Sequence, residues 1–316
     1  PFSTVSLIVA GFPMQMAAVM GKQELVDLCT GKIGCWMITH PDKGSDVTMV
    51  DVRPELSAGQ QGNKGNMWGR LQGDEIVING QCSAWVSNGA VAQVALGYLS
   101  AEYEDGFFAR DGNPYGMAVI IPLDLPGVSK GKPLEKIGQR ALPQGEIYFD
   151  NVRVPKRFAV ALKDDYYGNM TSAWSFAGTH MGQAFTGVAR AGFELALQYC
   201  HERKQGGRTL IDHQLTRYRL GDMLRRVELC RSVARRSLAY ARLSPLTHPY
   251  VTAAGKVTVT QEAMKVVDEA FQLFGGAGMS REYPIEKLYR DARVAIIEDG
   301  ENTILTMRLG VLAQQL

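Results

Sequence analysis

The chain has 316 residues, of which 46% are hydrophobic and 21% are charged, and its formal net charge is +2. This length and composition are typical of a globular protein with a sizeable core and more than one structural unit. Because the net charge is small and no dense run of Lys or Arg occurs, the sequence argues against nucleic acid or an anionic membrane as the main partner.

Cys and His are dispersed along the chain. The five cysteines are odd in number and never form a Cys-x-x-Cys pair, which favours free thiols in a reducing compartment. No two of the five histidines lie four residues apart, so we expect no metal site. The chain starts at Pro1 with an apolar segment that lacks the basic start of a signal peptide, and no apolar run is long enough to span a membrane. We therefore expect a protein that is not secreted and whose sequence is entered midway.

Residues 1–31 are rich in Ala, Met, Leu and Val. Gly11-Phe12-Pro13 predicts a break, and Thr30-Gly31 predicts a stop. The segment therefore predicts two short helical pieces, the second from Lys22 to Cys29.

Residues 32–157 consist of short apolar runs separated by Gly, Pro, Asn and Asp. The runs at 75–80, 117–122, 146–149 and 152–155 predict strands. Several strands at this spacing, without helices between them, indicate an antiparallel barrel or sandwich.

Beyond about residue 168 the apolar residues recur at three- and four-residue steps, which predicts helices. One stripe runs from Leu220 to Leu238 and a second from Met264 to Phe274, and a further helix is expected over 175–203. We interpret this half as a bundle of long antiparallel helices, so the fold class is α+β with several domains.

Strands first and helices afterwards argue against a doubly wound sheet. The chain has no Gly-x-Gly-x-x-Gly after a strand, no phosphate-binding Gly-x-x-x-x-Gly-Lys-Ser/Thr loop and no Gly-x-Ser-x-Gly elbow. Any dinucleotide must therefore be held by another architecture.

Two stretches in the strand region can carry chemistry. Trp36 to Asp46 is either a strand running into a plain turn or a strand edge that offers amides and hydroxyls to a planar polar ligand. Trp85 and Ser87, if on one strand, share a face, so the indole can cover an aromatic ring while the hydroxyl binds it. The alternative for that pair is a core Trp and a surface Ser.

The helical half holds three more such stretches. Arg203 ends a predicted helix, where it either complements the helix dipole or binds a pyrophosphate. The glycines at 275–278 indicate a sharp bend or a close backbone approach. Glu298, Asp299 and Glu301 stand together, which in isolation is typical of a solvated turn.

Taken together, these stretches resemble the acyl-CoA dehydrogenase family over essentially the whole chain. The matching motifs are Thr-x-Pro-x-x-Gly-Ser-Asp (39–46), Trp-x-Ser-Asn-Gly (85–89), Lys-Ile-Gly-Gln-Arg (136–140), Phe-Asp-Asn-Val-Arg-Val-Pro (149–155), Arg-Lys-Gln-x-Gly (203–207), Phe-Gly-Gly-x-Gly (274–278) and Glu-Tyr-Pro-Ile-Glu-Lys-Leu-Tyr-Arg-Asp-Ala (282–292). Each is weak alone, but all occur in the family's order.

The resemblance implies a fold and an assembly. The expected domains are the end of an N-terminal helical domain (1–31), a middle antiparallel β-barrel (32–157) and a C-terminal up-down four-helix bundle (158–316). Family members carry further helices before the segment that matches residue 21, so most of the first domain lies outside this sequence. The resemblance also implies FAD as cofactor and a homotetramer, built as a dimer of dimers.

The resemblance assigns cofactor and substrate residues by position. Those implied to bind FAD are Trp36, Ile38, Thr39, Trp85, Ser87, Arg203, Gln205, Gln272 and Gly276. Ser45 falls near the expected CoA moiety.

The family's catalytic base falls on Asp299 when residues are counted without a gap from Asp291, and Glu298 is the second choice. Asp is shorter than Glu by about 1.5 Å. Some family branches nevertheless use Asp, among them certain cyclic acyl-CoA dehydrogenases and nitroalkane oxidase, so the resemblance indicates an atypical branch and substrate. Other branches place a Glu near residue 177, where this chain has Ala177-Gly178.

Three positions depart from the family pattern. His40 replaces a Glu, Gly206 replaces a Phe, and Glu301 stands where a small hydroxyl residue normally binds the flavin. Glu301 either weakens FAD binding by approaching the phosphates or points outward.

The resemblance implies oxidation of an acyl-CoA to its α,β-unsaturated product in fatty acid metabolism, in the bacterial cytoplasm or the mitochondrial matrix. Asp299 would take the α-proton, flavin N5 would take the β-hydride, and an electron-transferring flavoprotein would accept the electrons. The alternatives are a flavin oxidase of the same fold, acting on an acyl-CoA or a nitroalkane, and a non-catalytic relative that binds an acyl carrier protein.

Overall fold

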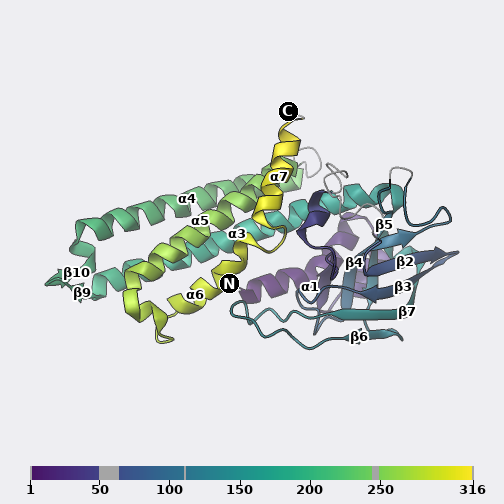
Figure 1. Ribbon diagram of the computed structural model, residues 1–316, viewed down its shortest axis with the longest axis horizontal. Coiled ribbons are helices and arrows are strands. Elements are labelled where there is room, and N and C mark those ends of the chain that lie inside the picture. The colour runs from purple at the N-terminus through teal and green to yellow at the C-terminus, as the bar shows by residue number, and fades with distance from the viewer. Residues whose placement is uncertain (1, 50–63, 110–111, 244–248, 315–316) are drawn as a thin grey trace. The chain divides into compact units, whose positions relative to one another are not determined.

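The computed structural model describes residues 2–49, 64–109, 112–243 and 249–314, which form two compact units (Figure 1). The strand-rich unit comprises residues 3–135 and 140–173, and the helical unit comprises residues 136–139 and 174–316 together with Phe2. The expected domain boundaries at 31 and 157 remain predictions. In the part of the chain that the structure describes, no helix is both long and apolar enough to cross a membrane.

The strand-rich unit begins with two helices, α1 (Phe2–Val19) and α2 (Gln23–Cys29). The second was predicted, but the predicted break at Gly11–Pro13 is wrong, because α1 runs through Pro13 as one helix. Burial of Phe12 and Met16 against the unit stabilises this continuous helix. Gly34 lets the first strand approach it, because a Cβ there would lie 2.5 Å from the Ala10 carbonyl oxygen.

Within the described residues, the sheet of this unit contains eight strands. They are β1 (Gly34–Met37), β2 (Met67–Gln72), β3 (Glu75–Gln81), β4 (Val94–Glu102), β5 (Gly116–Pro122), β6 (Val128–Lys130), β7 (Ile147–Pro155) and β8 (Ala159–Leu162). Short 3-10 helices lie at Ser45–Met49, Lys156–Phe158 and Lys163–Asp165. The strand order is β6-β7-β3-β2-β4-β5-β8, and β1 pairs with β4.

The predicted strands β3 and β5 are confirmed, but the expectation of a closed antiparallel barrel is wrong. Both β1 and β2 pair with β4 in parallel, and the sheet stays open between its outer strands β6 and β8. The two strands expected at 146–149 and 152–155 are one strand, β7. A register shift opposite Ile78–Gly80 and a positive φ of 50° at Asn151 absorb the turn-like Asp-Asn pair within that strand.

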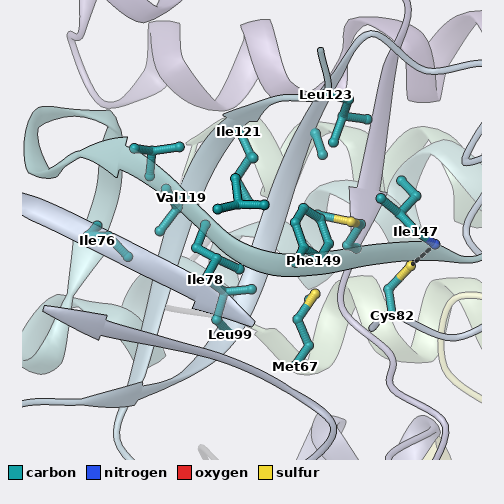
Figure 2. Packing of buried hydrophobic residues seen from close by; sticks show 14 of the residues in the cluster. Met67, Ile76, Ile78, Cys82, Leu99, Val119, Ile121, Leu123, Ile147 and Phe149 are labelled. Carbon is teal, nitrogen blue, oxygen red and sulfur yellow. Dashed lines mark hydrogen bonds between the residues drawn. The ribbon is translucent and has the colours of Figure 1, made fainter. Parts of the chain in front are cut away.

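One apolar cluster fills the inner face of the sheet (Figure 2). Ile78, Leu99, Ile121 and Phe149 come from four different strands and are nearly inaccessible to solvent. Cys82 joins this cluster, and its Sγ accepts a hydrogen bond of 3.1 Å from the backbone amide of Ile147. Side chains that need only volume and shape therefore build this core.

Long helices make up the helical unit, and α3 enters it from the strand-rich unit. They are α3 (Tyr166–Glu202), α4 (Gln214–Leu243), α5 (Pro249–Phe274), α6 (Ile285–Ala292) and α7 (Asn302–Ala313). The 3-10 segments are Leu210–Asp212, Gly275–Met279 and Arg293–Ile296, and β9 (Lys204–Gln205) pairs with β10 (Arg208–Thr209). Within this unit α4 and α5 run side by side (Figure 1).

The predicted stripe of α4 is largely confirmed, since Leu220, Met223 and Val227 are buried, whereas Leu224 is exposed. The helix expected from residue 175 begins earlier, at Tyr166. The five cysteines are all free and buried, as expected for reduced thiols. Cys29, Cys35 and Cys82 belong to the strand-rich unit, and Cys200 and Cys230 to the helical unit.

Candidate active site

The acidic turn, defined as Glu298, Asp299, Gly300 and Glu301, connects the last 3-10 segment to α7. Its backbone reverses through two consecutive left-handed residues, with φ of 51° at Asp299 and 89° at Gly300. Asp is among the few residues that tolerate this conformation, and Gly adopts it freely. A Cβ at residue 300 would also lie 3.0 Å from a methyl carbon of Leu305. The Asp-Gly pair therefore fixes the shape of the turn.

Glu301 is the N-cap of α7. Its side chain accepts hydrogen bonds of 2.8 Å from the amide of Thr303 and 3.1 Å from the amide of Ile304. Burial alone would raise the pKa of Glu301, but these backbone donors hold the pKa below its ordinary value. Its carboxylate is thus committed to the start of the helix, which accounts for an acid at a position where the resemblance expects a small hydroxyl.

Beneath the turn lies Lys256 of α5, which is only 1% exposed. Its ammonium donates hydrogen bonds of 2.7 Å to the Gly300 carbonyl and 2.8 Å to Oδ1 of Asn302. The Asn302 amide in turn donates to Oγ1 of Thr260 at 3.1 Å. A buried cation and two buried polar side chains therefore hold both ends of the Gly300–Asn302 segment.

Burial shifts the pKa values of the acids in this turn. It raises the pKa of Asp299, and the charge of Lys256 opposes that rise. The pKa of Glu298 is raised to about 7 by burial and by Asp299, against the hydrogen bond from Gln139. Burial lowers the pKa of Lys256 to about 8, and the surrounding carboxylates oppose that shift. The alternative of a freely solvated turn is wrong, because Glu298 and Asp299 are both partly buried.

A segment distant in sequence, residues 136–139, contacts this turn. Nε2 of Gln139 donates to Oε1 of Glu298 at 2.9 Å, and the backbone amide of Gln139 donates to Asp291. Asp291 is 1% exposed and also pairs with Lys287, while Arg290 donates to the Ile137 carbonyl. Helix α6 thus anchors the segment that presents Gln139 to Glu298.

Sequence reasoning missed Lys256, Gln139, Asn302 and Thr260. For Lys256 a signal existed, because it lies in phase with the buried residues Thr252, Thr260 and Val267 of its helix. A charged residue in a core phase is unusual and points to a specific partner.

In the strand-rich unit, Thr39, Trp85 and Ser87 are brought together through Ser83. The hydroxyls of Thr39 and Ser83 lie 2.7 Å apart, and the amide of Trp85 donates to Ser83 Oγ at 3.3 Å. The side chain of Gln144 bonds to the Trp85 carbonyl and to Ser87 Oγ. The expectation of a strand here is wrong, because Trp85 lies in a turn. Its indole is 62% exposed, so it offers an open aromatic face beside hydroxyl groups.

The other predicted residues of this unit lie close in sequence to Thr39 but have different surroundings. Trp36 on β1 packs against Phe12 with ring centroids 4.8 Å apart. Ile38 lies beside a small cavity, and Ser45 begins a 3-10 helix. Buried His40 contacts the Tyr98 carbonyl at 3.3 Å, and burial together with Lys43 lowers its pKa to about 4. His40 is therefore neutral near pH 7.

In the helical unit, Arg203, Gln205, Gln272 and Gly276 share one end of the helices and are all exposed. Tyr199 of α3 stacks on Phe274 of α5 with ring centroids 4.2 Å apart, which brings the ends of the two helices together. The departure at Gly206 has a local cause. Gly206 and Gly207 form the two-residue turn between β9 and β10, and both have positive φ.

Two family models match the chain. The acyl-CoA dehydrogenase middle domain matches residues 35–152, and the acyl-CoA dehydrogenase C-terminal domain matches residues 173–312. Together they cover most of the chain. The chain belongs to the acyl-CoA dehydrogenase family.

Relatives with curated names support the assignment to this family. The chain is 31% identical over 277 residues to glutaryl-CoA dehydrogenase from Desulfococcus multivorans, covering 87% of this chain and 65% of the relative. It is 28% identical to cyclohexane-1-carbonyl-CoA dehydrogenase from Geobacter metallireducens, covering 90% of this chain and 70% of that protein. The chain therefore spans about two thirds of the length of these relatives.

The acyl-CoA dehydrogenase fold is also found in solved structures. Butyryl-CoA dehydrogenase from Megasphaera elsdenii superposes with a TM-score of 0.84 and 23% identity, covering 98% of this chain and 77% of that one. Members of the family use FAD. The strand-rich unit fits such a group, because the open indole of Trp85 can cover a planar ring and Thr39, Ser83 and Ser87 offer hydroxyls beside it.

Proposed function

We propose that this protein is an FAD-dependent acyl-CoA dehydrogenase in which Asp299 removes the α-proton of the acyl thioester. The observation that carries the proposal is the acidic turn. Its backbone fixes Asp299 in a left-handed conformation, and burial raises the pKa of the carboxyl. A base is most effective when its pKa approaches the working pH and its position is fixed.

The residues of the chain have distinct parts in this mechanism. FAD, when bound, supplies the acceptor for the β-hydride. Trp85, Thr39 and Ser87 of the strand-rich unit would bind its ring system, and exposed Arg203, Gln205, Gln272 and Gly276 would bind the nucleotide end of the FAD held by a neighbouring subunit. Asp299 receives the α-proton at its carboxylate. A backbone amide, that of Asp299 itself, polarises the thioester carbonyl.

The substrate is inferred to be an acyl-CoA other than a simple straight chain. A short Asp base requires the backbone or the acyl group to come closer by about 1.5 Å than a Glu base does. The similarity to a cyclohexane-1-carbonyl-CoA dehydrogenase supports a cyclic acyl group. We further propose a homotetramer, with Ser45 near the CoA moiety and an electron-transferring flavoprotein as electron acceptor.

The test uses the full-length protein and begins with its absorbance spectrum. Bound FAD should give a yellow protein that bleaches anaerobically with one class in a panel of straight, branched and cyclic acyl-CoAs. Asp299→Asn should bind FAD and fail to bleach, whereas Glu282→Asn, on an exposed loop of the same unit, should behave as the unmodified protein. A colourless protein, or full reduction of Asp299→Asn, would overturn the proposal. Release of peroxide in air would instead assign an oxidase.

A further inference from the structure

A cation buried in a helical core normally pairs with a carboxylate. The direct hydrogen bonds of the Lys256 ammonium go to neutral groups instead. Lys256 is 1% exposed, and the hydrogen-bond acceptors of its ammonium are the neutral Gly300 carbonyl and the Asn302 amide oxygen. A methionine would fill similar volume without the cost of burying a charge. The position therefore calls for a reason beyond packing.

Both acceptors of Lys256 lie within three residues of Asp299. Gly300 is its immediate neighbour and shares the left-handed turn, while Asn302 is the first residue of α7. Thr260, one turn along α5, supports Asn302, and Gly178 of α3 leaves room for the lysine stem, with its ideal Cβ 3.6 Å from Lys256 Cβ. The ammonium therefore holds the backbone of the residue that directly follows Asp299, together with the first residue of α7.

Besides Lys256 of α5, the charged groups around the turn in the described residues come from three elements. Glu298 and Glu301 lie on the turn itself, Lys136 lies on the 136–139 segment, and Asp291 of α6 acts on Lys136. Glu301 is held by the start of α7, and Glu298 accepts the hydrogen bond from Gln139. Among the described groups, Lys256 is the cation whose charge lowers the pKa of Asp299.

We propose that Lys256 is the positioning residue of the base, because its ammonium holds the Gly300 carbonyl and the Asn302 side chain that follow Asp299 in the turn. This inference rests on the proposed role of Asp299. The carboxylate is then ready to accept the α-proton in a fixed place, which matters most for a base with a short side chain.

The experiment compares Lys256→Met and Lys256→Gln with Lys265→Met, which alters an exposed lysine of the same helix. All three should bind FAD. In Lys256→Met the rate of anaerobic flavin reduction should fall by at least about tenfold with little change in KM. The acid limb of its pH–rate profile should move upward by about 1 on the pH scale, because Asp299 loses its cation. Lys256→Gln should keep more of the rate but show the same shift, and Lys265→Met should show neither effect.

Asn302→Asp gives an independent test that leaves Lys256 in place. The isosteric carboxylate pairs with the ammonium, so the acid limb should again move to higher pH. This variant decides the question if the Lys256 variants fail to fold. If the acid limb of the pH–rate profile stays unchanged in the folded variants, the inference is overturned. The same holds if the variants lose thermal stability but keep their rate of flavin reduction. Asp299→Asn separates the two proposals: if it stays active, the assigned base is wrong, whatever Lys256 does.

Discussion

The apolar cluster of the sheet and the interior beneath the acidic turn are of different kinds. The sheet of the strand-rich unit covers apolar side chains such as Ile78 and Phe149, whose packing depends only on volume and shape. The helical unit buries Lys256, Asn302 and Thr260 directly against the acidic turn. An apolar interior supplies stability without directing any atom, whereas a polar one directs atoms at a cost in desolvation. We infer that proton abstraction depends on the second kind and the stability of the scaffold on the first.

The largest effect expected is on activity in the helical unit. Asp299→Asn should lower the rate of flavin reduction by roughly a thousandfold or more, because it removes the general base while keeping the shape of the turn. Stopped-flow absorbance under anaerobic conditions measures it. Its thermal unfolding should remain close to that of the unmodified protein, and a large loss of stability would show that the turn is also structural.

In the sheet we expect a substitution to lower stability and leave activity unchanged. Phe149→Ala should lower the free energy of unfolding by about 3–5 kcal/mol, because it removes a ring from a closely packed core. Urea unfolding followed by circular dichroism measures the change. Tyr148→Ala is the matched control, since that ring is 37% exposed on the same strand. The folded fraction of Phe149→Ala should keep its specific activity, and a loss of activity without a loss of stability would contradict the comparison.

Glu298 should make stability depend on pH. Its pKa in the folded protein is about 7 against an ordinary value of 4.5, so its contribution is fully present below pH 4.5 and is lost as the pH rises through 7. The difference between the unmodified protein and Glu298→Gln should therefore shift by about 1–3 kcal/mol between pH 4.5 and pH 7.5, allowing for partial exposure. Urea unfolding at both pH values measures it. Glu282→Gln, an exposed control, should show no such difference.

The smallest effect concerns the cap of α7. Glu301→Ala should lower stability by about 1 kcal/mol, because the amides of Thr303 and Ile304 lose their acceptor. Glu301→Ser keeps a capping oxygen and should recover most of the loss in thermal unfolding. Equal behaviour of the two variants would show that the charge near Lys256, rather than the cap, is what matters at this position.

Helices and strands whose apolar residues recur with a single period were predictable from the sequence. The buried stripe of α4 and the strands β3 and β5 needed only local alternation of apolar residues. The open form of the sheet was not predictable, since parallel pairing of β1 and β2 with β4 depends on contacts far apart in the chain. The sequence predicts two strands in place of β7, because Asp150-Asn151 is a pair typical of turns. In the structure a bulge accommodates this pair within one strand.

The candidate site divides in the same way. Asp299 was reached by counting from a motif, and its role remains a prediction. Lys256 was missed because a lysine at a buried position of a helix breaks the apolar pattern that sequence reasoning follows. Gln139 was missed because its contact with Glu298 spans 159 residues, and no pattern within a helix or strand indicates it.

Each of the five buried thiols can report on the opening of the unit in which it lies. Burial raises the pKa of Cys29 to about 11 and of Cys82 and Cys230 to about 12, so a thiol reagent meets neither an accessible nor an ionised sulfur while the fold is closed. Modification of each cysteine, followed peptide by peptide in a mass spectrometer, then times the opening of its surroundings. The unmodified protein thereby reveals whether the strand-rich unit and the helical unit open together or one at a time.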